Sequence, residues 1–192
     1  EESVEDNQYK QRATDRTAAV ARSMKHTKET VHANVPNRAF SNSYLGADGI
    51  RLISTAHVTV NGTQSNTLTA DADLSEASLE DMMINIRSAT DSTGLRANLQ
   101  PRRLLIPSNL MFEATRILKS IGQNDTANNA VNALRQMGYL QEIVEWPFLT
   151  DTDAWFVITD VRNGLISFMR RAIAFEKDSD FDTGNYKHKA TE

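Results

Sequence analysis

The chain has 192 residues, a net charge of −4 and an apolar fraction of 40%, which fits one globular domain or two lobes that share a core. It contains no cysteine, so disulfides, cysteine nucleophiles and thiolate-bound metals are excluded. No apolar run is long enough to span a membrane, and no cluster of basic residues favours tight binding to nucleic acid.

Both ends of the sequence read as cut. The first residue is Glu1 rather than a methionine, and residues 183–192 read as an extended strand that stops at Glu192. We therefore expect the sequence to be a piece that is truncated at both ends.

Residues 8–35 contain neither glycine nor proline, which predicts one long helix that ends at Pro36. Steps of three and four residues trace a thin seam of small or mildly apolar side chains: Ala13, Thr17, Val20, Met24, Thr27, Val31 and Asn34. Such a seam is too weak for a coiled coil. It favours a helix that lies over a sheet or another subunit, with basic side chains facing water or neighbours. A solvated surface helix is the alternative.

Residues 41–73 are rich in serine, asparagine, glycine and threonine, and they predict loop with short strands. The strand signals are an apolar run, Ile50–Ile53, and an alternating run, His57–Val60. The low hydrophobicity of the whole stretch indicates an exposed or partner-covered excursion from the core.

A helix is predicted to begin after Ser75, whose side chain can cap free backbone amides. Leu74 can pack on Leu79 as a hydrophobic staple, and Gly94 marks the exit. The side chains expected to face inward are Leu79, Met82, Met83 and Ile86.

A buried strand at Leu104–Ile106 and a second helix follow, and Gly122 ends that helix. Its expected inward side chains are Leu110, Met111, Ala114, Ile117 and Leu118. Helix, strand and helix together predict one layer of an α/β or α+β lobe.

The remaining chain predicts a surface excursion followed by short strands. Residues 123–139 are rich in asparagine and include a short helix at Ala130–Met137. Strands are expected at Ile143–Trp146, Trp155–Thr159, Ile166–Phe168 and Ala172–Glu176, separated by turn residues. A turn at Asp182–Asn185 then leads into the last strand.

The histidines offer one candidate for chemistry. His26 and His32 are six residues apart, which places them on opposite sides of a helix. His57 lies near Ser54 and Thr55, but no orienting acid or oxyanion loop is visible nearby. A hydrogen-bonded structural histidine is therefore favoured over a Ser/His site.

The acidic series Asp178, Asp180 and Asp182, followed by Gly184, suggests a calcium loop. An EF-hand needs glycine at the sixth position and glutamate at the twelfth, where this chain has Thr183 and Lys189. The EF-hand is excluded, which leaves an irregular cation site or a solvated turn. No phosphate-binding glycine loop occurs either. By spacing alone, the sequence offers no catalytic constellation, and we assign no catalytic, cofactor-binding or metal-binding residue.

Several short sequence motifs occur in a fixed order, and this order identifies a protein family more specifically than any one motif does. These motifs are Thr27–Glu29, Ala33–Val35, Asn37–Phe40, Ser54–His57, Gly62–Asn66, Asp73–Ala77, Pro107 with Phe112–Ser120, Leu149–Phe156 and Phe181–Asn185. From about Tyr9 onward the chain resembles the major capsid protein of tailed bacteriophages.

The resemblance implies an α+β fold of the HK97-like capsid type, with a long spine helix. It places residues 1–40 and 166–192 in a peripheral domain, as the spine helix and the returning strands, and residues 41–165 in an axial domain. Compared with the family pattern, we expect two parts to be missing here: the N-terminal arm with the extended loop before the spine helix, and the end of the last strand with its tail.

The implied function is that of a structural protein without enzymatic activity. Copies would assemble into pentamers and hexamers of an icosahedral shell around double-stranded DNA, after synthesis in the bacterial cytoplasm. Scaffolding, portal or decoration proteins and non-specific contact with packaged DNA are the other implied partners, with no membrane and no cofactor. Subunit contacts are expected at Arg16, Arg22 and Glu29 on the spine helix and at Gln123, Asn124, Asn128 and Asn129 toward the capsomer axis.

Two alternatives remain open at this stage. An encapsulin-like nanocompartment shares the fold and encloses a cargo enzyme instead of DNA. A small α/β enzyme or ligand-binding domain would use His57 with Ser54 or an acidic residue.

Overall fold

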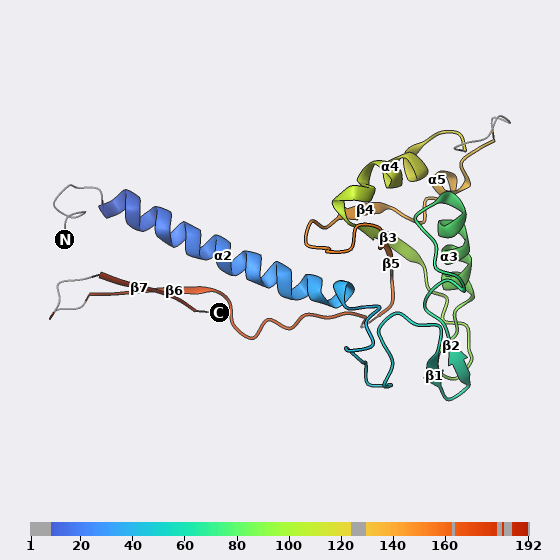
Figure 1. Cartoon of the computed structure of the whole chain (residues 1–192), viewed down its shortest axis with the longest axis horizontal. Coiled ribbons are helices and arrows are strands. Elements are labelled where there is room, and N and C mark those ends of the chain that lie inside the picture. The colour runs from blue at the N-terminus through green and yellow to red at the C-terminus, as the bar shows by residue number, and fades with distance from the viewer. Residues whose placement is uncertain (1–8, 124–129, 163, 180–181, 183–185, 192) are drawn as a thin grey trace. The chain divides into compact units, whose positions relative to one another are not determined.

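The computed structural model describes residues 9–123, 130–162, 164–179, 182 and 186–191. These residues form a mixed α+β structure with four α-helices, a short 3₁₀-helix and small sheets (Figure 1). The chain divides into two compact units, one of Glu1–His32 with Asn163–Glu192 and one of Ala33–Arg162. The mixed α+β class expected from the sequence is confirmed.

The long helix α2 spans Tyr9–Asn37, so the predicted helix is confirmed, and it ends one residue beyond Pro36. Proline removes a single hydrogen bond in the last turn, where the loss is small. The Arg38 amide still donates to the Asn34 carbonyl at 3.1 Å and completes that turn. No helix in the described part of the chain is long and apolar enough to cross a lipid bilayer.

The predicted apolar seam of α2 is only partly buried. Val20 and Val31 are 46% and 59% exposed in the single chain, so whether another subunit covers them stays a prediction. Thr17 and Met24 of the seam are partly buried, together with Ala21, Lys28 and His32 at helical spacing. His32 in this line has its Nε2 2.8 Å from Ser167 Oγ, which belongs to the same compact unit.

The returning segment contains one antiparallel pair, β6 (Ala174–Ser179) with β7 (Tyr186–Thr191). The expected strand at Ile166–Phe168 is wrong, since these residues form no strand. A strand needs a neighbour for its backbone hydrogen bonds, and no described segment pairs with these residues.

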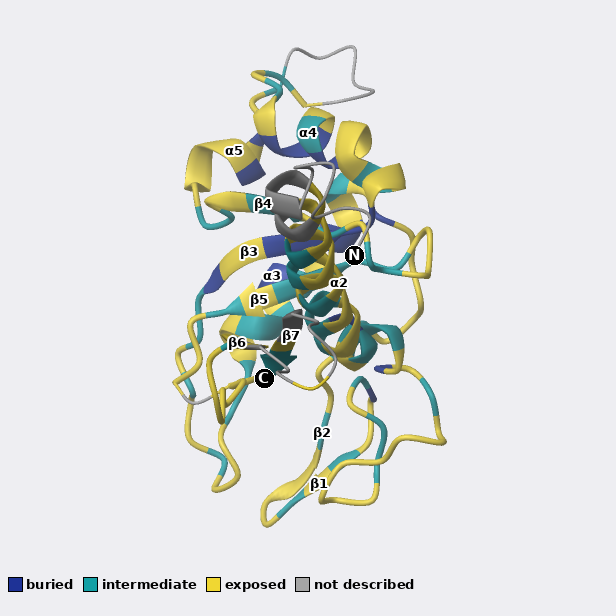
Figure 2. Cartoon of the chain, turned by 90° about the vertical axis from the view of Figure 1, so that its left-hand side faces the viewer, coloured by how far each residue is buried: buried dark blue, intermediate teal, exposed yellow. Residues whose placement is uncertain are grey.

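The second unit is built on a three-stranded sheet in which β3 (Pro101–Ile106) is central. It pairs in parallel with β4 (Glu142–Glu145) and antiparallel with β5 (Phe156–Thr159). The strands expected at these three places are confirmed to within a few residues. Figure 2 shows β3 as the most buried strand of the three.

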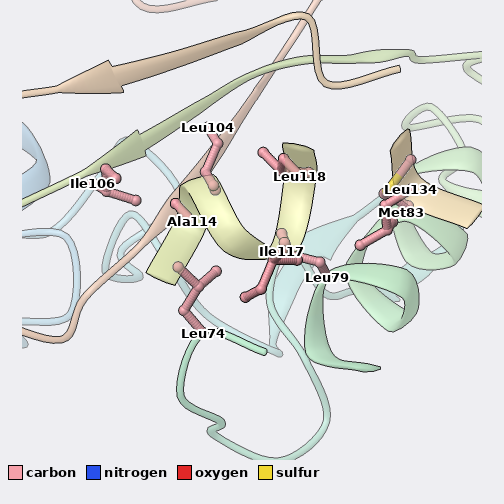
Figure 3. Close-up of a cluster of buried hydrophobic side chains, with 9 residues drawn as sticks. All are labelled: Leu74, Leu79, Met83, Leu104, Ile106, Ala114, Ile117, Leu118 and Leu134. Carbon is pink, nitrogen blue, oxygen red and sulfur yellow. The ribbon is translucent and has the colours of Figure 1, made fainter. Parts of the chain in front are cut away.

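Three helices accompany this sheet: α3 (Glu76–Ser88), α4 (Met111–Lys119, preceded by the 3₁₀-helix η1, Ser108–Leu110) and α5 (Ala133–Met137). Side chains from α3, α4, α5 and β3 converge in one core (Figure 3). Its members are Leu74, Leu79, Met83, Leu104, Ile106, Ala114, Ile117, Leu118 and Leu134. Met111, expected to face inward, is 42% exposed, because Leu110 takes that place against the core.

Helix α3 begins after Ser75, as the sequence predicts, and Ser78 adds a second capping hydrogen bond that was not predicted. Ser75 Oγ accepts a hydrogen bond from the Ser78 amide at 3.1 Å, and Ser78 Oγ accepts one from the Ser75 amide at 2.9 Å. This reciprocal capping box satisfies donors that a helix start leaves open. The helix ends at Ser88, so Gly94 does not mark its exit. Gly94 instead lies in a separate turn organised by the carboxylate of Asp91.

The stretch at 41–73 is mostly loop, as expected. The signal at His57–Val60 is confirmed by the hairpin of β1 (His57–Thr59) and β2 (Gly62–Gln64). The run Ile50–Ile53 is not a strand, since its only ladder contact is a single bridge between Leu45 and Arg51.

The surface excursion expected at 123–139 is partly corrected. Residues 124–129 lie outside the described residues. The short helix is confirmed as α5, but Asn132 and Leu134 are buried, at 1% and 3% exposure. Leu134 belongs to the core, and hydrogen bonds of Asn132 attach this stretch to the end of α4.

Candidate functional site

His57 is the first candidate for chemistry, and the structure places an acid beside it. A turn at Gly46–Gly49 brings Asp48 Oδ2 to 2.6 Å from His57 Nδ1, so Nδ1–H donates to the carboxylate. The expectation that no acid lies near His57 is wrong, because the pairing spans a loop. The expectation of a hydrogen-bonded histidine is confirmed. This hydrogen bond, with a further one from the Ile50 amide, holds the pKa of Asp48 below its ordinary value.

The arrangement around His57 lacks a nucleophile. Ser54 Oγ accepts a hydrogen bond from the Ala56 amide at 3.2 Å. His57 Nε2 is buried and has no hydrogen-bond partner within the described part of the chain. A histidine that contacts no hydroxyl at Nε2 cannot take its proton, so Ser54 and His57 form no catalytic pair.

The acidic series near the end of the chain gives no assembled metal site. Asp178 and Asp182 are exposed, whereas Asp180 and Gly184 lie outside the described residues. Among the residues that the structure describes, no group of three or more histidine or acidic side chains is placed to hold a metal ion.

The second unit contains a hollow of about 930 Å³. Its walls are largely apolar and include Trp155, whose indole N–H donates to the Ala72 carbonyl at 3.1 Å. Phe40 and Phe156 also line it, and their rings stack at a centroid distance of 5.8 Å. Four exposed aspartates belong to the same lining: Asp71, Asp73, Asp151 and Asp153. We call this feature, with its apolar walls and four aspartates, the acidic hollow.

Two of these aspartates crowd each other. The side-chain hydrogen bond with Asp151 and its negative charge raise the pKa of Asp153, while the same hydrogen bond lowers the pKa of Asp151. Arg51 also lines the acidic hollow, and its guanidinium donates to the Phe40 carbonyl at 3.2 Å. The four aspartates therefore leave the acidic hollow with an excess of negative charge.

An exposed segment follows in the other unit. Leu165, Ile166, Phe168 and Met169 are 79%, 54%, 89% and 64% exposed, and Arg170 and Arg171 after them are also exposed. We call residues 165–171 the apolar–arginine segment. Sequence reasoning assigned a short strand here and missed this surface. The signal was a run of large apolar residues without polar alternation, followed directly by two arginines.

The residues expected at subunit contacts are mostly on the surface. Arg16 and Arg22 are exposed on α2, Glu29 is partly buried on the same helix, and Gln123 is exposed beyond α4. Asn124, Asn128 and Asn129 lie outside the described residues. Their roles at contacts between copies stay predictions.

A family model described as "Phage capsid protein" matches residues 2–190, and the chain belongs to this family. It is a structural protein of the phage head and virion, it associates with copies of itself, and it is not an enzyme. The enzyme alternative built on His57 is thereby overturned. No curated protein and no solved structure matches the chain.

Proposed function

We propose that the chain is the major capsid protein of a tailed-phage head, with the HK97-like fold. Its copies form pentamers and hexamers that close into an icosahedral shell around double-stranded DNA. The observation that carries this proposal is the family match over residues 2–190, taken together with the sequence resemblance.

The two compact units support a division into a peripheral and an axial domain. We assign residues 1–40 and 166–192 to the peripheral domain, as the spine helix and the returning strands, and residues 41–165 to the axial domain. The unit of Glu1–His32 with Asn163–Glu192 contains most of α2 and the β6–β7 pair. The unit of Ala33–Arg162 contains the three-stranded sheet and its helices.

The surface of α2 supports a role as a contact between copies. The helix has 29 residues, and its predicted apolar seam leaves Val20 and Val31 exposed. Exposed apolar side chains on an amphipathic helix gain free energy when a partner covers them. We propose that Arg16, Arg22 and Glu29 meet a neighbouring copy along this helix. By matched position, we propose that Gln123, Asn124, Asn128 and Asn129 point toward the capsomer axis.

The charge of the chain fits a shell that holds DNA without binding it tightly. A net charge of −4 and the absence of a basic cluster leave only weak, non-specific contact with packaged DNA. Portal, scaffolding and decoration proteins are the other partners that this proposal implies.

Electron microscopy of the purified protein tests the proposal. We expect uniform hollow shells, and a dispersed monomer under all assembly conditions would contradict it. Chemical analysis of the contents separates a phage head from an encapsulin-like compartment. Particles that consistently enclose a cargo enzyme would favour the compartment.

A further inference from the structure

The apolar–arginine segment needs a cover in the assembled state. Its four large apolar side chains are each more than half exposed, with Phe168 at 89%. Clusters of exposed apolar residues beside charged ones mark places where proteins meet. The two arginines at the end of the segment restrict the cover to a surface that carries negative charge.

The acidic hollow has the complementary chemistry. Its apolar and aromatic walls can bury large side chains, and its four aspartates can pair with guanidinium groups. Its volume of about 930 Å³ is large enough for several side chains. The raised pKa of Asp153 reflects a second carboxylate close by, and a positive charge placed there would relieve this repulsion.

We propose that the apolar–arginine segment of one copy docks into the acidic hollow of a second copy. This inference rests on the proposed function, because it assigns one of the contacts by which copies associate. The segment and the hollow are different surfaces of the same chain, so the contact is heterologous. Heterologous contacts generate rings when the rotation closes, and pentamers and hexamers are such rings.

Charge complementarity favours the apolar–arginine segment as the partner of the acidic hollow. The same aspartates would repel nucleic acid and the phosphates of a lipid surface. Within the apolar–arginine segment, Phe168 and Leu165 supply apolar contact area and Arg170 and Arg171 supply the charge. Docking of the segment into the hollow of its own chain is the competing outcome that the experiment must separate.

The cysteine-free sequence allows a clean cross-linking test. One preparation carries Phe168→Cys and a second carries Asp71→Cys, and the two are mixed and treated with a short bis-maleimide. Both positions are exposed, so neither change disturbs the core. The matched control mixes Phe168→Cys with Val60→Cys, because Val60 is 94% exposed and does not line the acidic hollow.

We expect the mixture with Asp71→Cys to give about tenfold more cross-linked dimer than the control mixture, because docking raises the effective concentration of the two thiols. A yield no higher than that of the control would overturn the inference. A chain with both Phe168→Cys and Asp71→Cys that links only to itself, while the mixture gives no dimer, would also overturn it.

A charge swap provides an independent readout. Arg170→Glu with Arg171→Glu should weaken self-association by about tenfold, as expected for two lost ion pairs. Adding Asp71→Lys and Asp73→Lys to that variant should restore the self-association, because the two charges at the contact are then exchanged. Failure of the swap to restore association would count against the docking.

Failure of the proposed capsid function and failure of the proposed docking can be told apart. Shells without the specific cross-link would leave the capsid function standing and overturn the docking. Specific dimers without shells would support the docking and contradict the proposed shell.

Discussion

At the scale of single residues, buried polar side chains connect segments that the apolar core alone would leave loose. The clearest example is Asn132, whose side chain is 1% exposed and forms several hydrogen bonds. Its amide donates to the Ile117 carbonyl at 2.6 Å and to Ser120 Oγ at 2.9 Å, and its oxygen accepts from the Arg135 amide at 3.1 Å. One side chain thus satisfies the last turn of α4 and caps the first turn of α5.

Replacement of this residue should be costly. Asn132→Ala leaves buried partners without hydrogen bonds and removes a helix cap, and we expect a loss of about 3 kcal/mol in the free energy of unfolding. Urea unfolding measures it. Gln136→Ala, at an exposed position of α5, is the control and should change little. A loss for Asn132→Ala no larger than that of the control would contradict this assignment.

The pair of Asp48 and His57 predicts a dependence on pH. The hydrogen bond from His57 lowers the pKa of Asp48 in the folded state, so folding favours the ionised carboxylate. This contribution is present above the ordinary carboxyl pKa of about 3.9 and is lost as the pH falls through the lower, folded-state value. Asp48→Asn should therefore lower the melting temperature near neutral pH, and its difference from the parent should shrink in acid below about pH 4. Asp81→Asn, at an exposed position of α3, serves as control. A difference that does not change with pH in this range would refute the prediction.

At the scale of elements, local signals fix the helices and strands that have their partners nearby. The start of α3 was predictable because a capping serine and an apolar staple lie within five residues of each other. β3 was predictable because Leu104, Leu105 and Ile106 are consecutive, apolar and buried.

The cap of α3 can be tested directly. Ser75→Ala should cost about 1 kcal/mol in the free energy of unfolding, the usual value for a lost N-cap. Ser88→Ala, at the exposed end of the same helix, should cost less, because its hydroxyl bonds only the Asn85 carbonyl. Equal losses for the two variants would show that the capping box does not stabilise the helix start.

Elements that depend on distant partners could not be predicted in the same way. The runs Ile50–Ile53 and Ile166–Phe168 have strand composition, yet neither has a neighbouring strand along its length. Asn132 is buried because the end of α4 lies against its side-chain amide. The asparagine-rich composition of residues 123–139 predicted a surface position instead.

The candidate contact surfaces also divide into those that local sequence predicts and those that depend on distant partners. The exposed charges of α2 follow from helix periodicity, so Arg16 and Arg22 could be named from the sequence. The acidic hollow could not, because it joins residues from Phe40 to Val161 that only the fold brings together. The Asp48–His57 pair could not be predicted for the same reason, because the two residues are nine apart in the sequence and only the folded loop brings them together.

At the scale of the whole molecule, two compact units carry surfaces that copies of the chain can cover. We predict that Arg16→Glu with Arg22→Glu prevents or strongly delays shell assembly, because both charges face outward from α2. Sedimentation of the assembled fraction measures it. Lys119→Glu, an exposed basic position at the end of α4, provides a control with one reversal. Unchanged assembly of the Arg16 and Arg22 variant would contradict the role of α2.

The central claim is that this chain is a shell subunit whose copies close into rings. A symmetry-resolved reconstruction of the purified particles tests it most directly. We predict five-fold and six-fold rings of one chain, with α2 of each copy against a neighbour. Particles built without such rings, or an arrangement in which α2 meets no other copy, would contradict it.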